Sequence, residues 1–314
     1  MQISYIILAH KNPKQLKRLV ERLQEPWTRF YIHIDKNIHI NEFRFELKAT
    51  DDVIYLPENY RYPGIWGDIG IVKATLEAMR LVLNENRNGY CILITGQDYP
   101  LRSNHAISDF FQKNDGKNFL SIVQNPDSWN KHYLDRITKY KINKSSQRGH
   151  FLQLSSIFDS DFYDFKTLGK LNYLRKTGQA KEISNIFRKR QFPKNIEPYG
   201  GGVYFALKMD LIQKVLEYHE KNPKFLEWNN YTLCADEVFF HSVIMKIQQD
   251  EDLNLERSLT YVNWDRPSGP LPVTFEIEDL QELTKASKDF LWARKFDVDL
   301  DKRILDEIDE KLLA

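Results

Sequence analysis

The sequence predicts an α/β fold with a largely parallel central sheet, and two kinds of segment predict it. Short continuous apolar runs at residues 3–8, 30–34 and 90–94 are rich in isoleucine and aromatic residues, as is typical of strands covered on both faces. Between them, apolar residues recur at helical spacing, as in residues 12–23 around Pro13. Strands that alternate with helices are joined by crossover connections, which build parallel sheets.

The other expected elements continue this alternation. They are strands at 53–56, 199–207 and 259–264, and helices at 64–83, 208–222, 236–247 and the C-terminal end. The fourth buried strand ends in the turn-forming sequence TGQDYPLRS, and we expect Ser103 or Asn104 to cap the helix that follows.

Composition narrows the class of protein. With 314 residues, of which 42% are hydrophobic, the chain is long enough for a large domain with a substantial core. Its 45 lysines and arginines against 44 aspartates and glutamates give no overall positive field, which disfavours a nucleic-acid partner. The two cysteines, Cys91 and Cys234, do not indicate a disulfide framework or a cysteine-rich zinc site.

The beginning of the chain predicts its location. Met1 leads directly into the apolar run ISYIILAH, which is too short for a membrane span and lacks the basic leader of a signal peptide. Later segments also stay below about 18 uninterrupted apolar residues. We therefore expect a cytoplasmic protein, with peripheral contact at the inner membrane face as a further option.

One region interrupts the regular pattern. We expect a single domain over residues 1–314, with a basic insert at about 121–198. Between Lys166 and Lys194 the only acidic residue is Glu182, which is typical of a solvated helical face. An excursion of this length is otherwise a substrate-binding insert or lid, and its charge would suit an acidic glycan or a membrane surface. We favour the insert and leave its partner open.

Several familiar catalytic motifs are missing from the sequence. It has no G-x-x-x-x-G-K-[ST] phosphate loop, no G-x-G-x-x-G after the first strand, no G-x-S-x-G elbow and no H-E-x-x-H. The usual kinases, dehydrogenases, α/β-hydrolases and zinc proteases therefore lose support. His33 and Asp35 could be two metal ligands, but a third is not evident, and a hydrogen-bonded strand histidine is the preferred interpretation.

Polar residues follow the predicted strands at one edge of the sheet. His10 and Lys11 follow the first strand, Asp35 the second and Asp98 the fourth. In open α/β sheets, ligands bind beyond the carboxyl ends of the strands, so this edge is a candidate nucleotide site.

Further along the chain, two features complete a candidate site. Asp236 and Glu237 stand at an expected helix start, where capping explains both, or where one is a general base. The glycines at 200–202 open a strand and suit close approach to a ligand. With Arg294 and Lys295 downstream, the set provides a base for an acceptor hydroxyl and cations for a leaving diphosphate. Sugar transfer from a nucleotide sugar needs both.

Together these segments are similar to those of a known enzyme family. The chain resembles the core-2/I-branching β-1,6-N-acetylglucosaminyltransferases and the related peptide O-xylosyltransferases. The resemblance lies in segments that occur in the family's order, namely ISYIILAHKNPKQLKRLVERL, FYIHIDK, the Trp66-Gly67 helix, YCILITGQDYPLRS, YGGGVYFALK, ADEVFFHSVI and WARKFDVD. It covers most of the chain outside the middle insert.

The resemblance implies a GT-A-like (Rossmann-like) fold with a mixed, mostly parallel central sheet, a UDP-sugar donor and inversion at the anomeric carbon. It also implies that no metal and no other cofactor is required, because cationic side chains take over the metal's role. Where metal-dependent relatives of this fold carry Asp-x-Asp, this sequence has Gly96-Gln97-Asp98, with a single carboxylate.

The resemblance also assigns roles to single residues. Glu237 matches the family's catalytic base in a Pro-Asp-Glu motif, with Ala235 in place of proline. Asp35 matches the residue that contacts uracil, and Lys295 matches the lysine on the diphosphate. The remaining nucleotide-sugar candidates are His10, Arg266 and Arg294, of which either arginine is the second cation on the diphosphate. Candidates for the acceptor or sugar pocket are Asp98, Gly201, Gly202, Tyr204, Asp236 and Trp264, although Trp264 suits a half-buried core position equally well.

The expected function is transfer of N-acetylglucosamine from UDP-GlcNAc to a hydroxyl of a glycan or glycolipid acceptor, in bacterial surface polysaccharide or glycolipid synthesis. Animal members of the family carry a membrane anchor, a stem and many disulfides, whereas this sequence opens on the first strand and has two cysteines. We therefore expect a bacterial member. Three alternatives stay open. They are a UDP-xylose or other UDP-sugar transferase, a metal-dependent transferase using Asp98 or the Asp159–Asp161 pair, and a non-catalytic glycan-binding protein on the same fold.

Overall fold

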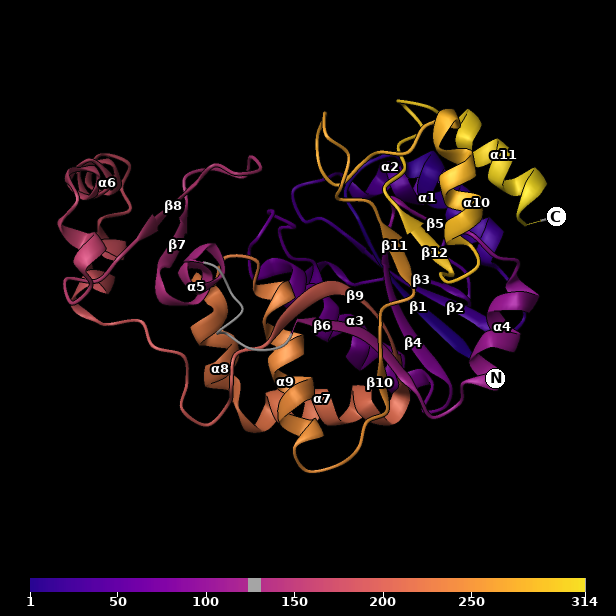
Figure 1. Ribbon diagram of the computed structural model, residues 1–314, viewed down its shortest axis with the longest axis horizontal. Coiled ribbons are helices and arrows are strands. Elements are labelled where there is room, and N and C mark those ends of the chain that lie inside the picture. Colours follow the sequence, from indigo (N-terminus) through magenta and orange to yellow (C-terminus); the bar gives the residue numbers. More distant parts are fainter. Residues whose placement is uncertain (124–130, 314) are drawn as a thin grey trace.

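The chain folds around a seven-stranded sheet, seen in a computed structural model that describes residues 1–123 and 131–313 (Figure 1). The strand order is β10-β6-β9-β4-β1-β2-β3. The strands are β1 (Ile3–Ala9), β2 (Thr28–Ile34), β3 (Val53–Tyr55), β4 (Tyr90–Thr95), β6 (Asn118–Val123), β9 (Gly200–Lys208) and β10 (Leu255–Glu256). β9 runs antiparallel to β4 and β6, and the other neighbours pair in parallel. The predicted α/β fold with a mixed, mostly parallel sheet is confirmed.

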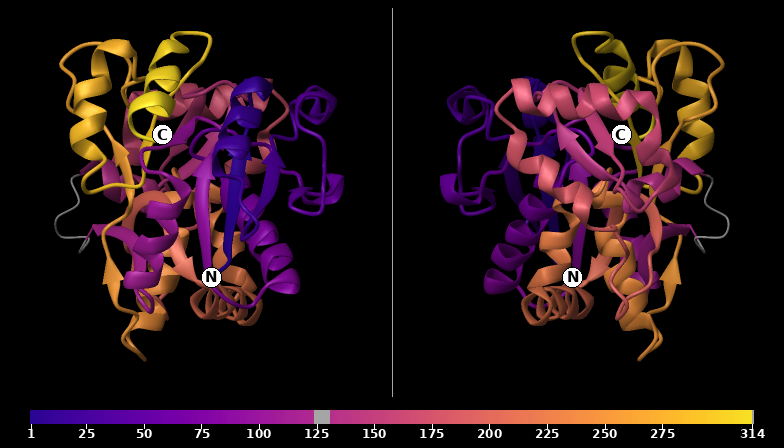
Figure 2. Two further views of the ribbon diagram at one scale, coloured as in Figure 1. Left: turned by 90° about the vertical axis from the view of Figure 1, so that its right-hand side faces the viewer. Right: turned by 90° about the vertical axis from the view of Figure 1, so that its left-hand side faces the viewer.

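Side-chain alternation in the strands explains why helices cover both faces. In β1, Ile3, Tyr5 and Ile7 point into one core cluster and Ile6 into the other. The first cluster is covered by α1 (Pro13–Leu23), α2 (Ile40–Glu46), α4 (Asn104–Lys113), α10 (Leu280–Ala286) and α11 (Arg303–Lys311). The second is covered by α3 (Gly70–Glu85), α7 (Met209–Lys221), α8 (Pro223–Trp228) and α9 (Phe239–Gln248). Figures 1 and 2 show α10 and α11 at one end of the molecule and α7 at the other.

A small second sheet joins the C-terminal part of the chain to the end of β4. Its order is β11-β12-β5, from β11 (Thr260–Val262), β12 (Trp292–Arg294) and β5 (Asp98–Pro100). β12 and β5 are antiparallel, which places Arg294 opposite Asp98. The segment expected to be only a turn thus contains a short strand, because its partner β12 lies about 200 residues away, beyond the reach of local sequence patterns.

The insert forms its own small body, which Figure 1 shows beside the main sheet. It contains α5 (Lys131–Thr138), the hairpin of β7 (Tyr140–Asn143) and β8 (Phe151–Leu154), and α6 (Phe165–Lys176). Two 3-10 segments, Ser160–Tyr163 and Ala180–Phe187, flank α6. Its core consists of Tyr140, Ile142, Leu152, Leu154, Leu174 and Ile186. Part of the predicted insert, residues 124–130, lies outside the described residues.

One buried arginine ties the insert to the main body. The Arg190 guanidinium donates to the carbonyl oxygens of Arg136 and Lys139 in α5 and the loop after it, at 3.1 and 3.0 Å. It also donates to the Trp228 carbonyl and the Thr232 hydroxyl of the main body, at 3.3 and 2.6 Å. These bonds fix α5 against the segment that leads to the acid pair.

Two helices begin later in the chain than the sequence predicts. The helix expected from residue 64 begins at Gly70, and the helix expected from residue 236 begins at Phe239. In the second case Cys234 has left-handed backbone (φ 56°) and residues 235–237 form a 3-10 turn before the helix. The predicted cap Ser103 is confirmed, since its hydroxyl accepts the N–H of Ala106 at 3.4 Å.

Among the described residues, no helix has the length and apolar content that crossing a bilayer requires.

Candidate active site

The expected polar edge forms where the parallel strands end. His10 directly follows β1, and Asp35 directly follows β2. The Asp35 carboxylate accepts the N–H of Asn37 at 2.8 Å, and a Cβ placed on Gly64 would lie 2.9 Å from its other oxygen. Gly64 therefore lets the loop before α3 approach Asp35. The buried Arg61 holds this region by donating to the Asp35 carbonyl at 2.9 Å.

Arg294 reaches this edge from β12 and is held there by Asp98. Its guanidinium donates to Oδ1 of Asp98 at 2.9 Å and also contacts the Thr95 hydroxyl. Asp98 is fully buried, and its other oxygen accepts the Thr95 N–H at 2.8 Å. Burial raises the pKa of Asp98, while Arg294 acts in the opposite direction. The structure thus places Asp98 behind Arg294, where it positions the guanidinium.

Three further cations, Lys11, Arg148 and Arg294, act on Lys295. Burial together with the charges of Lys11, Arg294 and Arg148 lowers the pKa of Lys295. Partial burial, Lys11 and Arg294 likewise lower the pKa of His10, which Asp35 opposes. We call Lys11, Arg148, Arg294 and Lys295 the cationic cluster. Lys11 is paired with Asp297 at 2.5 Å and Arg294 with Asp98 at 2.9 Å, and Arg148 and Lys295 leave the cluster with the net positive charge that a diphosphate requires.

Arg148 joins this cluster from the insert. It lies in the loop between β7 and β8, and its guanidinium stands 5.4 Å from the ring centre of Trp66. Trp66 is 40% exposed, in the loop before α3. The aromatic face supports the guanidinium in this position. The insert therefore supplies a charge to the nucleotide edge.

The acid pair has two different environments. Asp236 and Glu237 stand in the 3-10 turn before α9, so they precede the first turn of that helix instead of lying in it. Glu237 has a side chain that is 30% exposed, and its Oε2 accepts a hydrogen bond from Arg136 at 2.5 Å. Asp236 is 8% exposed, and its Oδ1 lacks a hydrogen-bond partner among the described residues. Burial and the neighbouring Glu237 raise the pKa of Asp236.

Tyr204 on β9 connects the acid pair with the cationic cluster. The Arg294 guanidinium lies 5.6 Å from the centre of its ring. Burial raises the pKa of Tyr204, and the charges of Asp236 and Glu237 act on the same hydroxyl. The acid pair and Arg294 therefore both lie within electrostatic range of a single tyrosine.

Gly201 and Gly202 of β9 differ in the space around them. A Cβ on Gly201 would lie 1.9 Å from the carbonyl oxygen of Ser121 and 2.6 Å from Nε2 of His241, so no other residue fits. Around a Cβ on Gly202, by contrast, the described residues leave 4 Å of open space. Gly202 is also exposed, and it is the glycine with room for a ligand.

Two sequence candidates lie in the loop after β11. Arg266 donates to Asp279 at 2.5 Å, so an ion pair within the C-terminal part of the chain holds it. Trp264 is 57% exposed, so it is a surface residue and not a half-buried core residue. Of the two arginine candidates for the diphosphate, the structure places Arg294 in the cationic cluster.

His33 takes the role preferred from the sequence. It is buried in β2, and its Nε2 accepts the N–H of Tyr62 at 3.0 Å. Burial lowers the pKa of His33 to about 4, so its ring is neutral at pH 7. The prediction of a hydrogen-bonded strand histidine is confirmed.

The carboxylates considered for a metal are engaged by protein groups. Asp159 accepts from the Ser156 hydroxyl at 2.7 Å, and Asp161 accepts from Lys139 at 3.0 Å. Glu276, Glu278 and Asp301 have carboxylate oxygens within 4.8 Å of one another, but Asp301 is paired with Arg303 at 2.8 Å.

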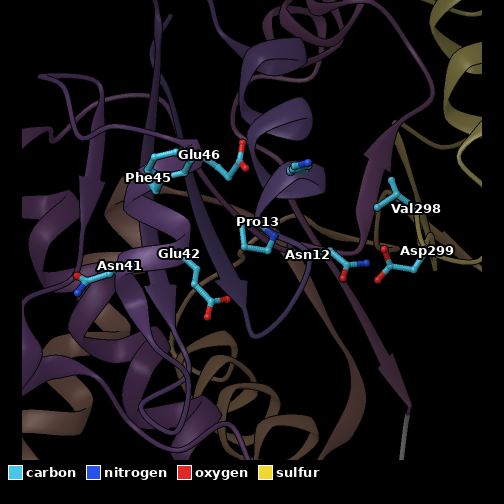
Figure 3. Close-up of a pocket in the computed structure, with 9 residues that line it drawn as sticks. Asn12, Pro13, Asn41, Glu42, Phe45, Glu46, Val298 and Asp299 are labelled. Atoms are coloured by element: carbon cyan, nitrogen blue, oxygen red, sulfur yellow. The ribbon is translucent and has the colours of Figure 1, made fainter.

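A cavity of about 570 Å³ lies near the nucleotide edge but does not coincide with it. Figure 3 shows it between α1 and α2, with Val298 and Asp299 opposite. Its lining includes three carboxylates, those of Glu42, Glu46 and Asp299, and one cation, Lys14, so its balance is negative. Negative charge of this kind repels a diphosphate, so we assign the nucleotide to the cationic cluster.

Sequence reasoning missed Arg136 and Arg148 as site residues. Both come from the insert, and their partners Glu237 and Trp66 lie 101 and 82 positions away in the chain. The only signal in the sequence was that the insert is basic.

Comparison with known proteins adds a family to this geometry. A family model described as Core-2/I-Branching enzyme matches residues 3–285. Xylosyltransferase 2 of Homo sapiens is 25% identical over 330 residues, which cover 98% of this chain and 33% of that protein. Xylosyltransferase 1 of Rattus norvegicus is 22% identical over 332 residues, with 99% and 35% covered. The chain spans about a third of the length of these curated relatives.

Among solved structures, the inositol-1-phosphate CTP transferase from T. maritima matches with a TM-score of 0.36 and 9% sequence identity. The match covers 100% of this chain and 98% of that one.

Proposed function

Because the chain belongs to the Core-2/I-Branching enzyme family, we propose that it is an inverting glycosyltransferase that uses a UDP-sugar and requires no metal ion. The family predicted from the sequence is confirmed over residues 3–285. One observation carries the proposed chemistry, namely that Tyr204 lies 5.6 Å from the Arg294 guanidinium and is also within range of the charges of Asp236 and Glu237. A leaving diphosphate and a general base need this mutual arrangement.

On the donor side, Asp35 reads the uracil and the cationic cluster holds the diphosphate. Lys295 and Arg294 provide the positive charge that a metal ion supplies in other transferases. Arg294 is preorganised by its ion pair with the buried Asp98, at 2.9 Å. A fixed cation stabilises the charge that develops on the leaving group without reorganisation during the reaction.

On the acceptor side, Glu237 accepts the proton of the acceptor hydroxyl. The hydroxyl oxygen then forms a bond to the anomeric carbon while the bond from that carbon to the diphosphate oxygen breaks. UDP leaves with the bonding electron pair, and a single displacement of this kind inverts the anomeric carbon. The exposed part of Glu237 gives the acceptor access, and its hydrogen bond to Arg136 fixes the direction of the carboxylate.

Two donor sugars enter the proposal. The sequence resemblance favours N-acetylglucosamine, whereas the relatives named above are xylosyltransferases, which favours UDP-xylose. A few contacts in the open space at Gly202 and beside Tyr204 decide between such sugars. The proposed acceptor is a hydroxyl of a glycan or glycolipid.

The test measures UDP release from a panel of UDP-sugars in the presence of EDTA, for the intact chain and for Glu237→Gln. We expect turnover of UDP-GlcNAc or UDP-xylose, and a loss of at least about a hundredfold in Glu237→Gln. Glu227→Gln is the matched control, because Glu227 is an exposed glutamate on α8. Its activity should equal that of the intact chain.

Other outcomes correct particular parts of the proposal. Turnover that needs added Mn²⁺ overturns the metal-free mechanism. Full activity of Glu237→Gln overturns the assignment of the base and makes Asp236→Asn the next variant. Binding of UDP without turnover of any donor favours a glycan-binding protein.

A further inference from the structure

An apolar surface lies on the insert, away from the proposed active site. Among the described residues, six large apolar side chains are more than 60% exposed, and five of them belong to the insert. These five, which we call the apolar patch, are Phe158 (61%), Tyr163 (76%), Phe165 (91%), Leu168 (68%) and Phe187 (63%). Single exposed apolar residues are ordinary in proteins, but a group confined to one small body marks an interaction surface.

The five residues come from segments that lie together. The N–H of Ile157 donates to the Ile186 carbonyl at 2.9 Å, which brings the chain at Phe158 beside the chain at Phe187. The Tyr163 hydroxyl donates to the Ile157 carbonyl at 3.1 Å. Phe165 and Leu168 are three residues apart in α6 and so share one face of that helix.

α6 is apolar on a second side as well. Leu174 points into the core of the insert and is fully buried, whereas Phe165 and Leu168 remain in contact with solvent. Figure 1 shows α6 at the end of the insert farthest from the main sheet.

Positive charge surrounds the apolar patch. Residues 166–194 contain nine lysines and arginines and one acidic residue, in a chain whose net charge is only +1. Six of these basic side chains are exposed close in sequence to the patch, namely Lys166, Arg175, Lys176, Lys181, Arg188 and Lys189.

The carboxylates in the same region are engaged by neighbouring groups. Asp161 accepts from Lys139 at 3.0 Å, and Asp164 accepts the backbone N–H of Lys166 at 2.9 Å. Asp159 accepts from Ser156 at 2.7 Å and lies 4.0 Å from Lys189. Together with Glu182 these three aspartates give four negative charges against nine lysines and arginines in residues 166–194, so the region keeps a positive balance.

We propose that the apolar patch docks on the surface of a bilayer that contains anionic phospholipids. Aromatic side chains settle at the boundary of headgroups and acyl chains, and lysines and arginines beside them bind lipid phosphates. A second copy of the chain is a poor occupant, since two copies meeting through this surface would bring like charges together. The contact is peripheral because α6 has only 12 residues.

Docking in this way attaches to the membrane the same insert that contributes to the active site. Arg136 and Arg148 belong to the same insert and contact Glu237 and Trp66 of the main body. The surface that meets lipid and the residues that complete the site are therefore parts of one small body.

Co-sedimentation of the full chain with vesicles tests the proposal. We expect binding to vesicles of phosphatidylcholine with phosphatidylglycerol, no binding to phosphatidylcholine alone, and weaker binding as salt is raised. The double variant Phe165→Ser with Leu168→Ser should bind at least tenfold more weakly. Both residues are exposed, so circular dichroism should show an unchanged fold. Phe45→Ser is the matched control, because Phe45 is 83% exposed on α2 and should leave vesicle binding unchanged.

Three results would overturn the proposal. The first is absence of binding to the anionic vesicles by the intact chain. The second is equal loss of binding in Phe45→Ser and in the double variant. The third is a dimer in light scattering that the double variant converts to a monomer, without vesicle binding by either, which would assign the apolar patch to a second copy.

Discussion

The Arg136 guanidinium donates a 2.5 Å hydrogen bond to the Glu237 carboxylate, and this bond spans the boundary between the insert and the main body. Arg136 lies in α5, which the buried Arg190 fixes through the Arg136 carbonyl at 3.1 Å. The insert thus contributes directly to the position of the proposed base.

We predict that Arg136→Gln lowers kcat about a hundredfold, because a displaced base loses its alignment with the acceptor hydroxyl. The dissociation constant of UDP should stay unchanged, since Arg136 contacts the acid pair and not the cationic cluster. Steady-state kinetics with calorimetry of UDP binding separates the two effects. Arg87→Gln is the control, because Arg87 is an exposed residue just after α3 in the chain, and its kcat should equal that of the intact chain. An unchanged kcat in Arg136→Gln would show that Glu237 needs no such support.

The residues at the carboxyl edge of the sheet were predictable, because the residue that follows a strand can be read from neighbouring sequence alone. An apolar run predicts a strand, and the residue that follows the strand stands at the carboxyl edge, so His10 and Asp35 were placed correctly at that edge. The partnership of Arg136 with Glu237 was not predictable. It depends on how the insert docks, and no periodic pattern in the insert encodes a contact across 101 positions.

The role of Asp98 shows a second limit. A sequence shows that a carboxylate follows β4, but not that β12 returns antiparallel to it and places Arg294 opposite. Asp98 therefore looked like a pocket residue, whereas the structure buries it as the partner of a cation. The helix start was predicted three residues too early, at residue 236, since the left-handed Cys234 and the 3-10 turn after it delay the start of α9 to Phe239.

We predict that Asp98→Asn destabilises the chain by about 3 kcal/mol, because it leaves the Arg294 charge in a largely buried position without its counter-ion. Urea denaturation measures this loss. The double variant Asp98→Asn with Arg294→Met should recover most of the stability, since both charges are then absent. It should still bind UDP at least about tenfold more weakly, as one cation of the cluster is missing. Wild-type stability in Asp98→Asn would contradict the role given to the pair.

The neighbouring glycines of β9 make a matched pair of variants. Gly201→Ala should cost about 2 kcal/mol or more in unfolding free energy, because its Cβ would meet the Ser121 carbonyl at 1.9 Å. Gly202→Ala should leave the melting temperature close to that of the intact chain, as its Cβ enters open space. We expect Gly202→Ala instead to raise KM for the donor, because the methyl group takes up room beside Tyr204. Equal stability of the two variants would rule out the packing argument.

Finally, the cationic cluster predicts how UDP binding depends on pH. Burial and the charges of Lys11, Arg294 and Arg148 lower the pKa of Lys295 below that of an ordinary lysine. Lys295 therefore loses its charge at a lower pH, and the affinity for UDP should begin to fall before free lysines titrate, at about pH 10. Calorimetry from about pH 7 to pH 10 measures this fall. Arg148→Gln should move it to higher pH by removing one repelling charge, and Lys295→Arg should abolish it because arginine stays charged throughout. A fall that persists unchanged in Lys295→Arg would mean that another group controls the alkaline limb.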